Sequence, residues 1–201
     1  MNKSPRSQKK RAAILEAAGQ LFCEQGPHQV SMDMVASAAG VSKQTVYSHF
    51  TSKELLFAEA VGAKCHNDEL SAALLEQGGS VRESLLLFGR GFRRLVLSEQ
   101  AINIFRTCVG SNDEQLSALF FEAGPVQVLG ILAQWLERQK QLGLLHHPDS
   151  QDAALQLLLM WQGKDRIRRE LGLPLMESPA QQEAWLNSCI DLFLSASTPQ
   201  S

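Results

Sequence analysis

The sequence lacks the patterns that build β-sheets and those that mark common catalytic sites. It has no strand-like alternation of apolar and polar residues and no Asn-Gly or Asp-Gly hairpin pair. It also contains no H-E-x-x-H, phosphate-loop, G-x-S-x-G or dinucleotide-binding signature. These absences favour an all-α protein and give no support to an enzyme.

Cysteines are few and far apart, and no two form a C-x-x-C pair. The four are Cys23, Cys65, Cys108 and Cys189. We expect them to be reduced, small core residues. The pair His146-His147 with Asp149 suggests a metal, but adjacent histidines point in different directions and these lie in a proline-containing loop. We therefore predict neither a metal nor a cofactor.

Long apolar runs are also missing. The longest, from Leu155 to Trp161, is interrupted by Gln156, whereas a membrane span needs about 20 apolar residues. The charged N-terminal stretch lacks the apolar region of a signal peptide. We expect a cytoplasmic protein that makes no membrane contact.

Charge is nearly balanced overall but unevenly distributed. The chain has 19 Lys and Arg residues against 21 Asp and Glu residues. Residues 1–11 contain no acid but five bases, namely Lys3, Arg6, Lys9, Lys10 and Arg11. Such a basic segment is suited to contacts with nucleic-acid phosphates.

Apolar stripes at helical spacing, separated by Gly, Pro and Ser, predict about nine to ten helices. The expected ranges are 7–25, two short helices within 31–50, then 51–77, 81–97, 99–109, 116–121, 126–141, 152–171 and 180–194. The segment from Ala153 to Trp161 is apolar on almost every side, so it needs cover from its own fold and from a second subunit. The mixed-sign stretch from Lys164 to Glu170 is more typical of a solvated face.

The segment from Ser31 to Phe50 predicts two helices joined by a tight turn. Ser31 and Ser42 are good N-caps, and Gly40 permits the positive φ that ends a helix. Small residues beside the turn let the two helices cross closely, as in a helix-turn-helix.

Residues 7–57 resemble the DNA-binding domain of the TetR/AcrR family. The resemblance lies in M-D-M-V-A, A-A-G-V-S, V-Y-S-H-F and S-K-E-L-L, and more weakly F-R-R-L-V-L-S and F-F-E-A-G-P resemble AefR-like C-terminal domains. It implies an N-terminal three-helix DNA-binding domain over 1–57 and a C-terminal effector-binding and dimerisation domain over 58–201. The chain departs from the family pattern at Pro27, Val30 and Ser48.

A helix-turn-helix reads bases with the start of its second helix. We expect Lys43 to contact guanine, Gln44 adenine and Thr45 the thymine methyl group. The remaining expected DNA-binding residues are Ser31, Ser42, Tyr47, Ser48, His49 and Lys53. The resemblance implies a homodimer on a palindromic operator, paired through the helices over 126–141 and 152–171.

The resemblance also implies a ligand-responsive repressor that a small hydrophobic or amphipathic effector releases from DNA, with the helix over 51–77 as the lever. Candidate pocket residues, which would equally suit a core, are Phe88, Phe92, Phe105, Cys108, Phe120, Phe121 and Trp161. Arg93 or Arg106 is a candidate partner for an anionic effector. Two alternatives stay open: a redox-sensing repressor that uses Cys108 or Cys65, and a helical interaction module without DNA binding.

Overall fold

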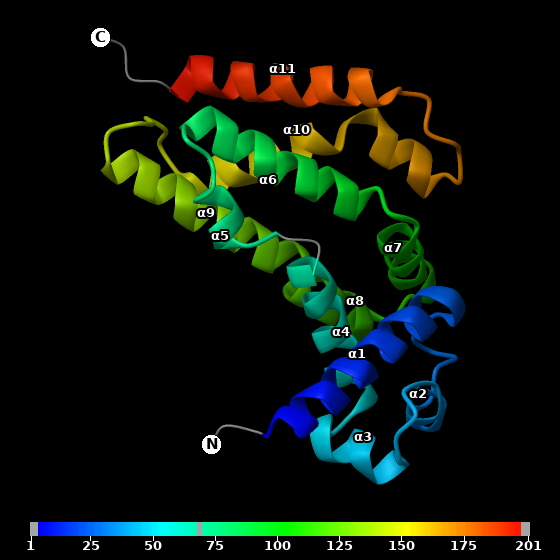
Figure 1. Cartoon of the computed structure of the whole chain (residues 1–201). Helices are drawn as coiled ribbons and strands as arrows, with labels where there is room; N and C mark the ends of the chain where they lie inside the picture. The colour runs from blue at the N-terminus through cyan, green and yellow to red at the C-terminus, as the bar shows by residue number, and fades with distance from the viewer. Residues whose placement is uncertain (1–3, 68–69, 198–201) are drawn as a thin grey trace. The chain divides into compact units, whose positions relative to one another are not determined.

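The computed structural model describes residues 4–67 and 70–197, with the side chains of 65–67 excepted. Within these residues the chain forms eleven helices and no strand (Figure 1). The prediction of an all-α protein is therefore confirmed. The helices are α1 (Pro5–Gln25), α2 (Met32–Ala38), α3 (Lys43–His49), α4 (Lys53–Asn67), α5 (Ala72–Leu75), α6 (Val81–Val96), α7 (Glu99–Ser111), α8 (Glu114–Ala123), α9 (Pro125–Gln141), α10 (Ser150–Glu170) and α11 (Pro179–Ser197).

Most of these helices begin at a residue whose side chain caps them. The hydroxyls of Ser31, Ser42 and Ser80 accept a hydrogen bond from the backbone N–H three residues later. The carboxylates of Asp113 and Asp149 do the same for α8 and α10. Such caps satisfy backbone donors that have no partner inside the helix, so local sequence fixes where these helices start.

The chain divides into two compact units. The first joins Met1–Lys64 to Glu99–Pro125, and the second joins Cys65–Ser98 to Val126–Ser201. The first unit thus holds α1–α3, most of α4, α7 and α8, whereas the second holds α5, α6 and α9–α11. This division differs from the expected boundary after residue 57, because a later part of the chain returns to complete the first unit.

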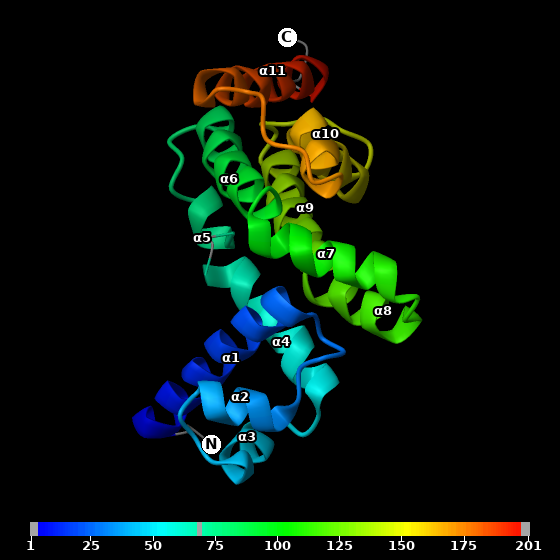
Figure 2. The same cartoon turned by 90° about the vertical axis from the view of Figure 1, so that its right-hand side faces the viewer.

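In the first unit α1 packs against α2, α3 and α7 (Figure 2). Its buried residues include Ile14 and Phe22, and the Phe22 ring meets the Phe57 ring edge-on with centroids 5.3 Å apart. Helix α7 adds Ile104 and Cys108 to the same core. A core shared in this way fixes the orientation of α2 and α3.

In the second unit α6, α10 and α11 pack against one another. Trp161 of α10 is fully buried, as is Phe88 of α6. At Gly89 a Cβ atom would lie only 2.7 Å from Cδ1 of Leu186, so a larger residue there would require the Leu186 side chain to move. The same core includes residues of α9 such as Leu132.

The expected continuous helix over 51–77 is wrong. Helix α4 ends at Asn67, and the short α5 begins at Ala72. Ser71 is extended, and its hydroxyl accepts from the backbone N–H of Leu74, so it starts a new helix. Leu70 and Leu75, on either side of this cap, are both buried in the second unit.

The expected solvated face over Lys164–Glu170 is also wrong. Asp165 is fully buried, and α10 is broken just before it at Gly163, where φ is 58° and ψ is −168°. The carboxylate is buried because a buried cation, Arg93 of α6, lies beside it.

The stretch Glu114–Gln141 is long and apolar enough to cross a membrane by length and composition alone. It is, however, two helices, because the backbone at Gly124 is not helical. In the second of them Leu132, Trp135 and Leu136 are buried in the core of the second unit. Of the most apolar window in this stretch 28% is buried, and one helix of this kind is weak evidence for a membrane span.

Candidate nucleic-acid interface and effector site

The helix-turn-helix is built as the sequence predicts. The Ser31 hydroxyl accepts from the Met34 N–H at 3.2 Å, and the Ser42 hydroxyl accepts from the Thr45 N–H at 3.2 Å. Gly40 has a φ of 63°, in the left-handed region that favours glycine, and turns the chain between α2 and α3. Both helices then bury one face, with Val35 and Val46 in the shared core.

Burial of that face turns the other face of α3 outward. Lys43, Gln44, Tyr47 and Ser48 are exposed, while Thr45 is half-buried. An outward helix face with amide, hydroxyl and ammonium donors and no carboxylate suits the edges of bases in a major groove.

Several of the expected DNA contacts already have intramolecular partners, and the Ser42 and Thr45 hydroxyls lie 2.8 Å apart. The Lys43 ammonium lies 2.9 Å from both carboxylate oxygens of Asp33 in α2. This contact raises the Lys43 pKa, chiefly through the hydrogen bond to Asp33. The Ser48 hydroxyl donates to the Thr45 carbonyl at 2.7 Å. Both members of the Lys43–Asp33 pair are solvent-exposed, so Lys43 is able to exchange Asp33 for DNA.

Arg11 in the basic leader has a structural role that the sequence did not reveal. Its guanidinium pairs with Glu59 and lies over the Phe50 ring, 5.2 Å from the ring centre. It therefore ties α1 to α4 and to the end of α3. Arg6 and Lys9 are exposed on α1, whereas Lys3 lies outside the described residues.

The seven expected effector-pocket residues fall into two groups. Phe88, Phe92 and Trp161 meet in the second unit, with the two Phe ring centres 6.4 Å and 6.3 Å from Trp161. The first unit contains Phe105, Cys108, Phe120 and Phe121. There Phe105 faces Phe120 at 6.4 Å, Cys108 is buried and Phe121 is 57% exposed.

The indole N–H of Trp161 is a buried donor without an acceptor in the part of the chain that the structure describes. Buried polar groups in proteins almost always have partners, so such an orphan is informative. It stands beside Phe88 and Phe92 in the buried core of the second unit.

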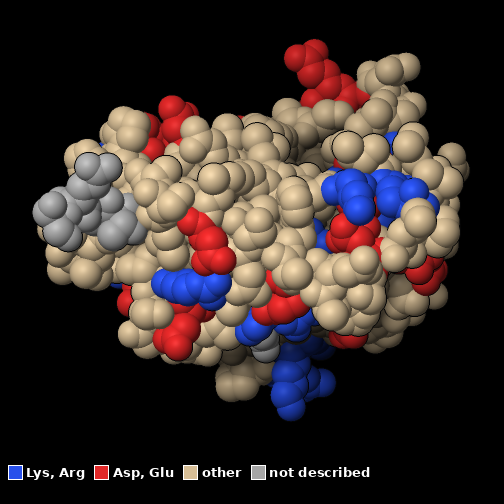
Figure 3. Space-filling view, turned by 90° about the horizontal axis from the view of Figure 1, so that it is seen from above, with Lys and Arg blue, Asp and Glu red and all other residues tan. Residues whose placement is uncertain are grey.

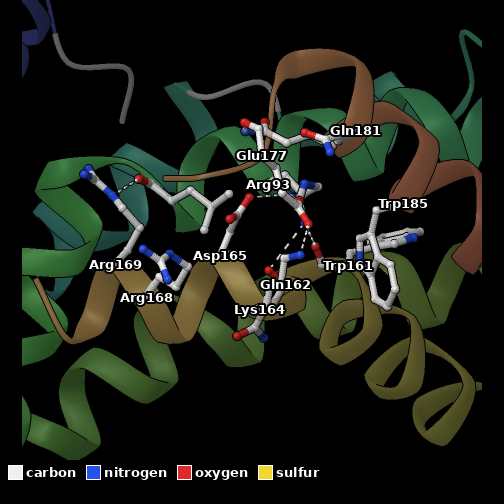
Figure 4. Close-up of polar contacts among 12 residues, drawn as sticks. Arg93, Trp161, Gln162, Lys164, Asp165, Arg168, Arg169, Glu177, Gln181 and Trp185 are labelled. Atoms are coloured by element: carbon white, nitrogen blue, oxygen red, sulfur yellow. Dashed lines mark hydrogen bonds and ion pairs between the residues drawn. The ribbon is translucent and has the colours of Figure 1, made fainter. Parts of the chain in front are cut away.

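Arg93, an expected partner for an anionic effector, is bound inside the second unit (Figure 4). Its guanidinium donates to the Trp161 and Gln162 carbonyls and to the Asp165 carboxylate at 3.2 Å. Burial, and then the nearby Glu177, raise the pKa of Asp165. Arg93 therefore already has an internal counter-ion. Arg106 lies in α7 and is exposed.

The thiols show no sign of activation. Burial raises the pKa of Cys23 and of Cys108 to about 11 and also raises that of Cys189. Because the thiolate is the reactive form, a raised pKa disfavours a redox switch at Cys108. The side chain of Cys65 lies outside the described residues.

A groove of about 580 Å³ lies between the start of α10 and the end of α11. None of the seven expected pocket residues lines it. Its lining includes His147, Asp152, Leu159, Leu192 and Phe193. Over the described side chains no cluster of His, Cys, Asp and Glu residues is suited to a metal ion, and His147 instead bonds the Ser150 hydroxyl at 2.8 Å.

Curated relatives match the N-terminal part of the chain. The transcriptional activator FasR of Mycolicibacterium smegmatis is 43% identical over 56 residues, which are 28% of this chain and 25% of that protein. The regulator UidR of Escherichia coli K12 is 40% identical over 55 residues, 27% of this chain and 28% of UidR. The chain thus spans about a quarter of the length of these curated relatives.

Solved structures match nearly the whole chain. A protein of Mesorhizobium loti MAFF303099, described as a TetR-family transcriptional regulator, has a TM-score of 0.79 and 26% identity, with 98% of this chain and all of that one covered. The flavonoid-responsive regulator FrrA has a TM-score of 0.72 and 31% identity, with 96% of this chain and all of FrrA covered.

Two family models cover most of the sequence. Residues 14–60 match the model for bacterial regulatory proteins of the tetR family. Residues 83–197 match the C-terminal domain of AefR-like transcriptional repressors. Together with the outward face of α3, these matches identify the chain as a DNA-binding transcriptional regulator of the TetR family.

Proposed function

We propose that the protein is a ligand-responsive repressor that binds a palindromic operator as a homodimer in the cytoplasm. The observation that carries this proposal is the outward face of α3, which presents Lys43, Gln44 and Tyr47 on a helix anchored by Val46 and Phe50. Two such helices related by a two-fold axis would enter successive major grooves, about one helical turn apart.

In this proposal Lys43, Gln44 and Thr45 read bases. Tyr47, His49 and Lys53 contact phosphates, as do the capped helix starts at Ser31 and Ser42 and the exposed Ser48. Phosphate contacts fix position, and base contacts give specificity. Gln44 is the sharpest test among them, because its amide is exposed and suits adenine, whereas Lys43 must first leave Asp33.

The test uses duplex DNA from upstream of the protein's own coding sequence in a mobility-shift titration. Gln44→Ala should weaken specific binding by about 1–3 kcal/mol and leave binding to unrelated DNA unchanged. The matched control is Gln29→Ala, because Gln29 is an exposed amide in the loop before α2. Equal losses on specific and unrelated DNA would contradict base reading by Gln44, and no binding by the wild type would contradict the repressor.

For the homodimer, exposed apolar residues favour α10 and α11. Leu155 and Leu159 of α10 and Leu192 of α11 are 44%, 58% and 62% exposed. By contrast, α9 has no large hydrophobic residue among those classed as exposed in the described chain. The expected interface comprised the helices over 126–141 and 152–171, which are α9 and α10. We therefore propose an interface that retains α10 and replaces α9 with α11.

Seen from above, Lys, Arg, Asp and Glu side chains are scattered over the surface, and most of it is formed by other residues (Figure 3). The groove between α10 and α11 is lined by Leu159 and Leu192, so it continues the same apolar face. A second copy of the chain is the occupant we propose for it.

The effector in this proposal is a small amphipathic molecule bound at Phe88, Phe92 and Trp161. The unpartnered indole N–H of Trp161 supports an effector with an oxygen acceptor, and the two Phe rings support an apolar or aromatic body. FrrA, which is described as flavonoid-responsive, makes polyphenols a reasonable first panel.

A thermal-shift screen of such molecules tests this site. A ligand that raises the melting temperature of the wild type should have a weaker effect on Trp161→Phe, which keeps a six-membered aromatic ring but removes the indole N–H. Ligands that stabilise both proteins equally would contradict the role of Trp161.

A further inference from the structure

Helix α10 is interrupted at Gly163, and side chains of other helices in the second unit bind the backbone at this interruption. The φ of 58° and ψ of −168° at this residue lie in a region that residues with a side chain rarely adopt. In an α-helix each carbonyl accepts from the N–H four residues later. The break therefore interrupts the backbone hydrogen bonds that the carbonyls just before Gly163 would otherwise accept.

Three of these carbonyls accept hydrogen bonds from side chains of other helices. The Met160 carbonyl accepts from the indole N–H of Trp185 in α11 at 2.9 Å. The Trp161 and Gln162 carbonyls accept from the Arg93 guanidinium of α6, the latter at 3.4 Å. Figure 4 shows Arg93 and Trp185 close to Trp161 and Gln162. The break is thus capped from two helices.

Arg93 also bridges the two sides of the break. While Nη1 contacts the carbonyls before Gly163, Nη2 contacts the carboxylate of Asp165 after it at 3.2 Å. A second carboxylate, that of Glu177, lies 3.9 Å from Nη2. Arg93 is 5% exposed and Asp165 is fully buried, so neither is able to exchange its partner for water at low cost.

Beyond the break, α10 holds the C-terminal end of α6. Arg166 donates to the Val96 carbonyl at 2.7 Å, and Arg169 donates to the Leu97 carbonyl at 3.1 Å. Helix α6 ends at Val96, and the chain passes from the second unit to the first between Ser98 and Glu99. The half of α10 after Gly163 therefore grips the segment through which the second unit connects to α7.

We propose that the Gly163 break is a regulatory hinge that relays effector occupancy at Trp161 to the Ser98–Glu99 connection. Arg93 is the positioning residue that keeps the hinge fixed, and Arg166 and Arg169 carry its movement to the end of α6. An effector that displaces Trp161 shifts the carbonyl that Arg93 holds, and residues 164–170 move with the end of α6. The inference rests on the proposed function, because the hinge would couple binding of the effector to binding of the operator.

Gly163→Ala tests the hinge with a substitution in α10. Its Cβ would lie 3.0 Å from Nε1 of Trp185 and 3.4 Å from Nη1 of Arg93, at a φ unfavourable for alanine. We expect the amides of Leu97 and Ser98, which bond the Arg93 and Leu95 carbonyls, to exchange hydrogen about tenfold faster. Hydrogen–deuterium exchange of the full chain, read by mass spectrometry, measures this rate.

The matched control is Gly143→Ala. Gly143 also has a positive φ, 72°, and nothing lies within 4 Å of its Cβ position. This variant should lose only the cost of a left-handed alanine, and exchange at Leu97 and Ser98 should be unchanged. Faster exchange in both variants would mean general loosening and would overturn the hinge.

The relay itself is tested in an Arg166→Gln/Arg169→Gln background. There Gly163→Ala should add no further exchange at Leu97 and Ser98, because the contacts that carry the movement are gone. An equal increase in both backgrounds, or none in either, overturns the proposal. Should Gly163→Ala fail to fold, Trp185→Phe provides the same comparison, since it removes the donor to the Met160 carbonyl and leaves residue 163 unchanged.

Operator binding completes the test. In the mobility-shift titration Gly163→Ala should weaken binding to the upstream DNA by about fivefold or more, while Gly143→Ala should not. Faster exchange with unchanged DNA affinity would overturn the regulatory role of the hinge. No binding by the wild type would instead count against the proposed repressor, and the exchange result would still stand.

Discussion

His147 is a buried histidine that the fold holds in one hydrogen-bonding arrangement. The Ser150 hydroxyl donates to the Glu137 carboxylate at 2.6 Å, so its oxygen is left to accept from Nε2 of His147 at 2.8 Å. Nδ1 is then a bare acceptor, buried and without a partner among the described residues. A second proton on this ring would have no acceptor.

Stability should therefore fall as the pH is lowered. Burial lowers the pKa of His147 below its ordinary value of 6.5, so between that value and the folded-state pKa the unfolded chain binds the extra proton. We expect the free energy of unfolding to drop below about pH 6.5, by at most about 1.4 kcal/mol per pH unit for this one proton. Urea titrations across this range measure it.

His147→Gln should remove this part of the pH dependence. The exposed neighbour provides the control, because His146→Gln leaves the buried His147 ring and its bond to Ser150 in place. Identical profiles for the wild type and His147→Gln would contradict the assignment.

The sequence correctly predicted residues whose structural role depends on their neighbours in the chain. Ser31, Ser42 and Gly40 act within three or four positions of themselves, and each is found in its expected role. Asp165 was misjudged because its partner, Arg93, lies 72 residues earlier in the chain. Spacing within a helix contains no information about a partner on another helix.

Among the elements, the α2–α3 turn depends on backbone conformation rather than on packing. A Cβ on Gly40 would meet nothing within 4 Å, so Gly40→Ala should lose only the cost of a left-handed alanine, about 1 kcal/mol. Gly19, inside α1, also has nothing within 4 Å, and Gly19→Ala should gain up to about 1 kcal/mol.

Denaturant unfolding of Gly40→Ala and Gly19→Ala measures these opposite changes in the free energy of unfolding. Gly40→Asn serves as the control, because Asn tolerates the left-handed region and should restore part of the loss. A neutral effect of Gly40→Ala would show that the turn adjusts to a negative φ.

Sequence located most helices but not their interruptions. The apolar stripe over 152–171 predicted one helix, and only the backbone angles of Gly163 reveal two halves. An isolated glycine inside a helical pattern is compatible with a straight helix or a break, so the sequence alone left this open. Both helix breaks lie beside tertiary partners that favour a change of chain direction. At Ser71 the partner is the core of the second unit, and at Gly163 it is Arg93.

For the whole molecule, the proposed dimer gives a sharp prediction. Leu159 is exposed on α10 and lines the groove between α10 and α11, so Leu159→Glu would place a charge in an apolar interface. We expect light scattering to report a monomer for this variant at concentrations where the wild type is a dimer. The control is Val109→Glu on α7, at a residue that is 64% exposed.

A wild type that is monomeric in the same measurement would contradict the homodimer. A dimer that persists in Leu159→Glu would instead move the interface away from this groove. The sequence predicted that α10 needed cover from a second subunit, but it could not show that Leu192 of α11 is exposed as well.

The first unit is formed by two separate segments of the chain, and this affects the design of truncated fragments. A fragment that stops at residue 57 or 64 omits Ile104, Cys108 and Leu116, which belong to the core around α1–α4. Such a fragment would leave apolar surface uncovered and should melt well below the intact protein. Chimeras that exchange DNA specificity between relatives therefore need two insertions, 1–64 and 99–125, rather than one N-terminal swap.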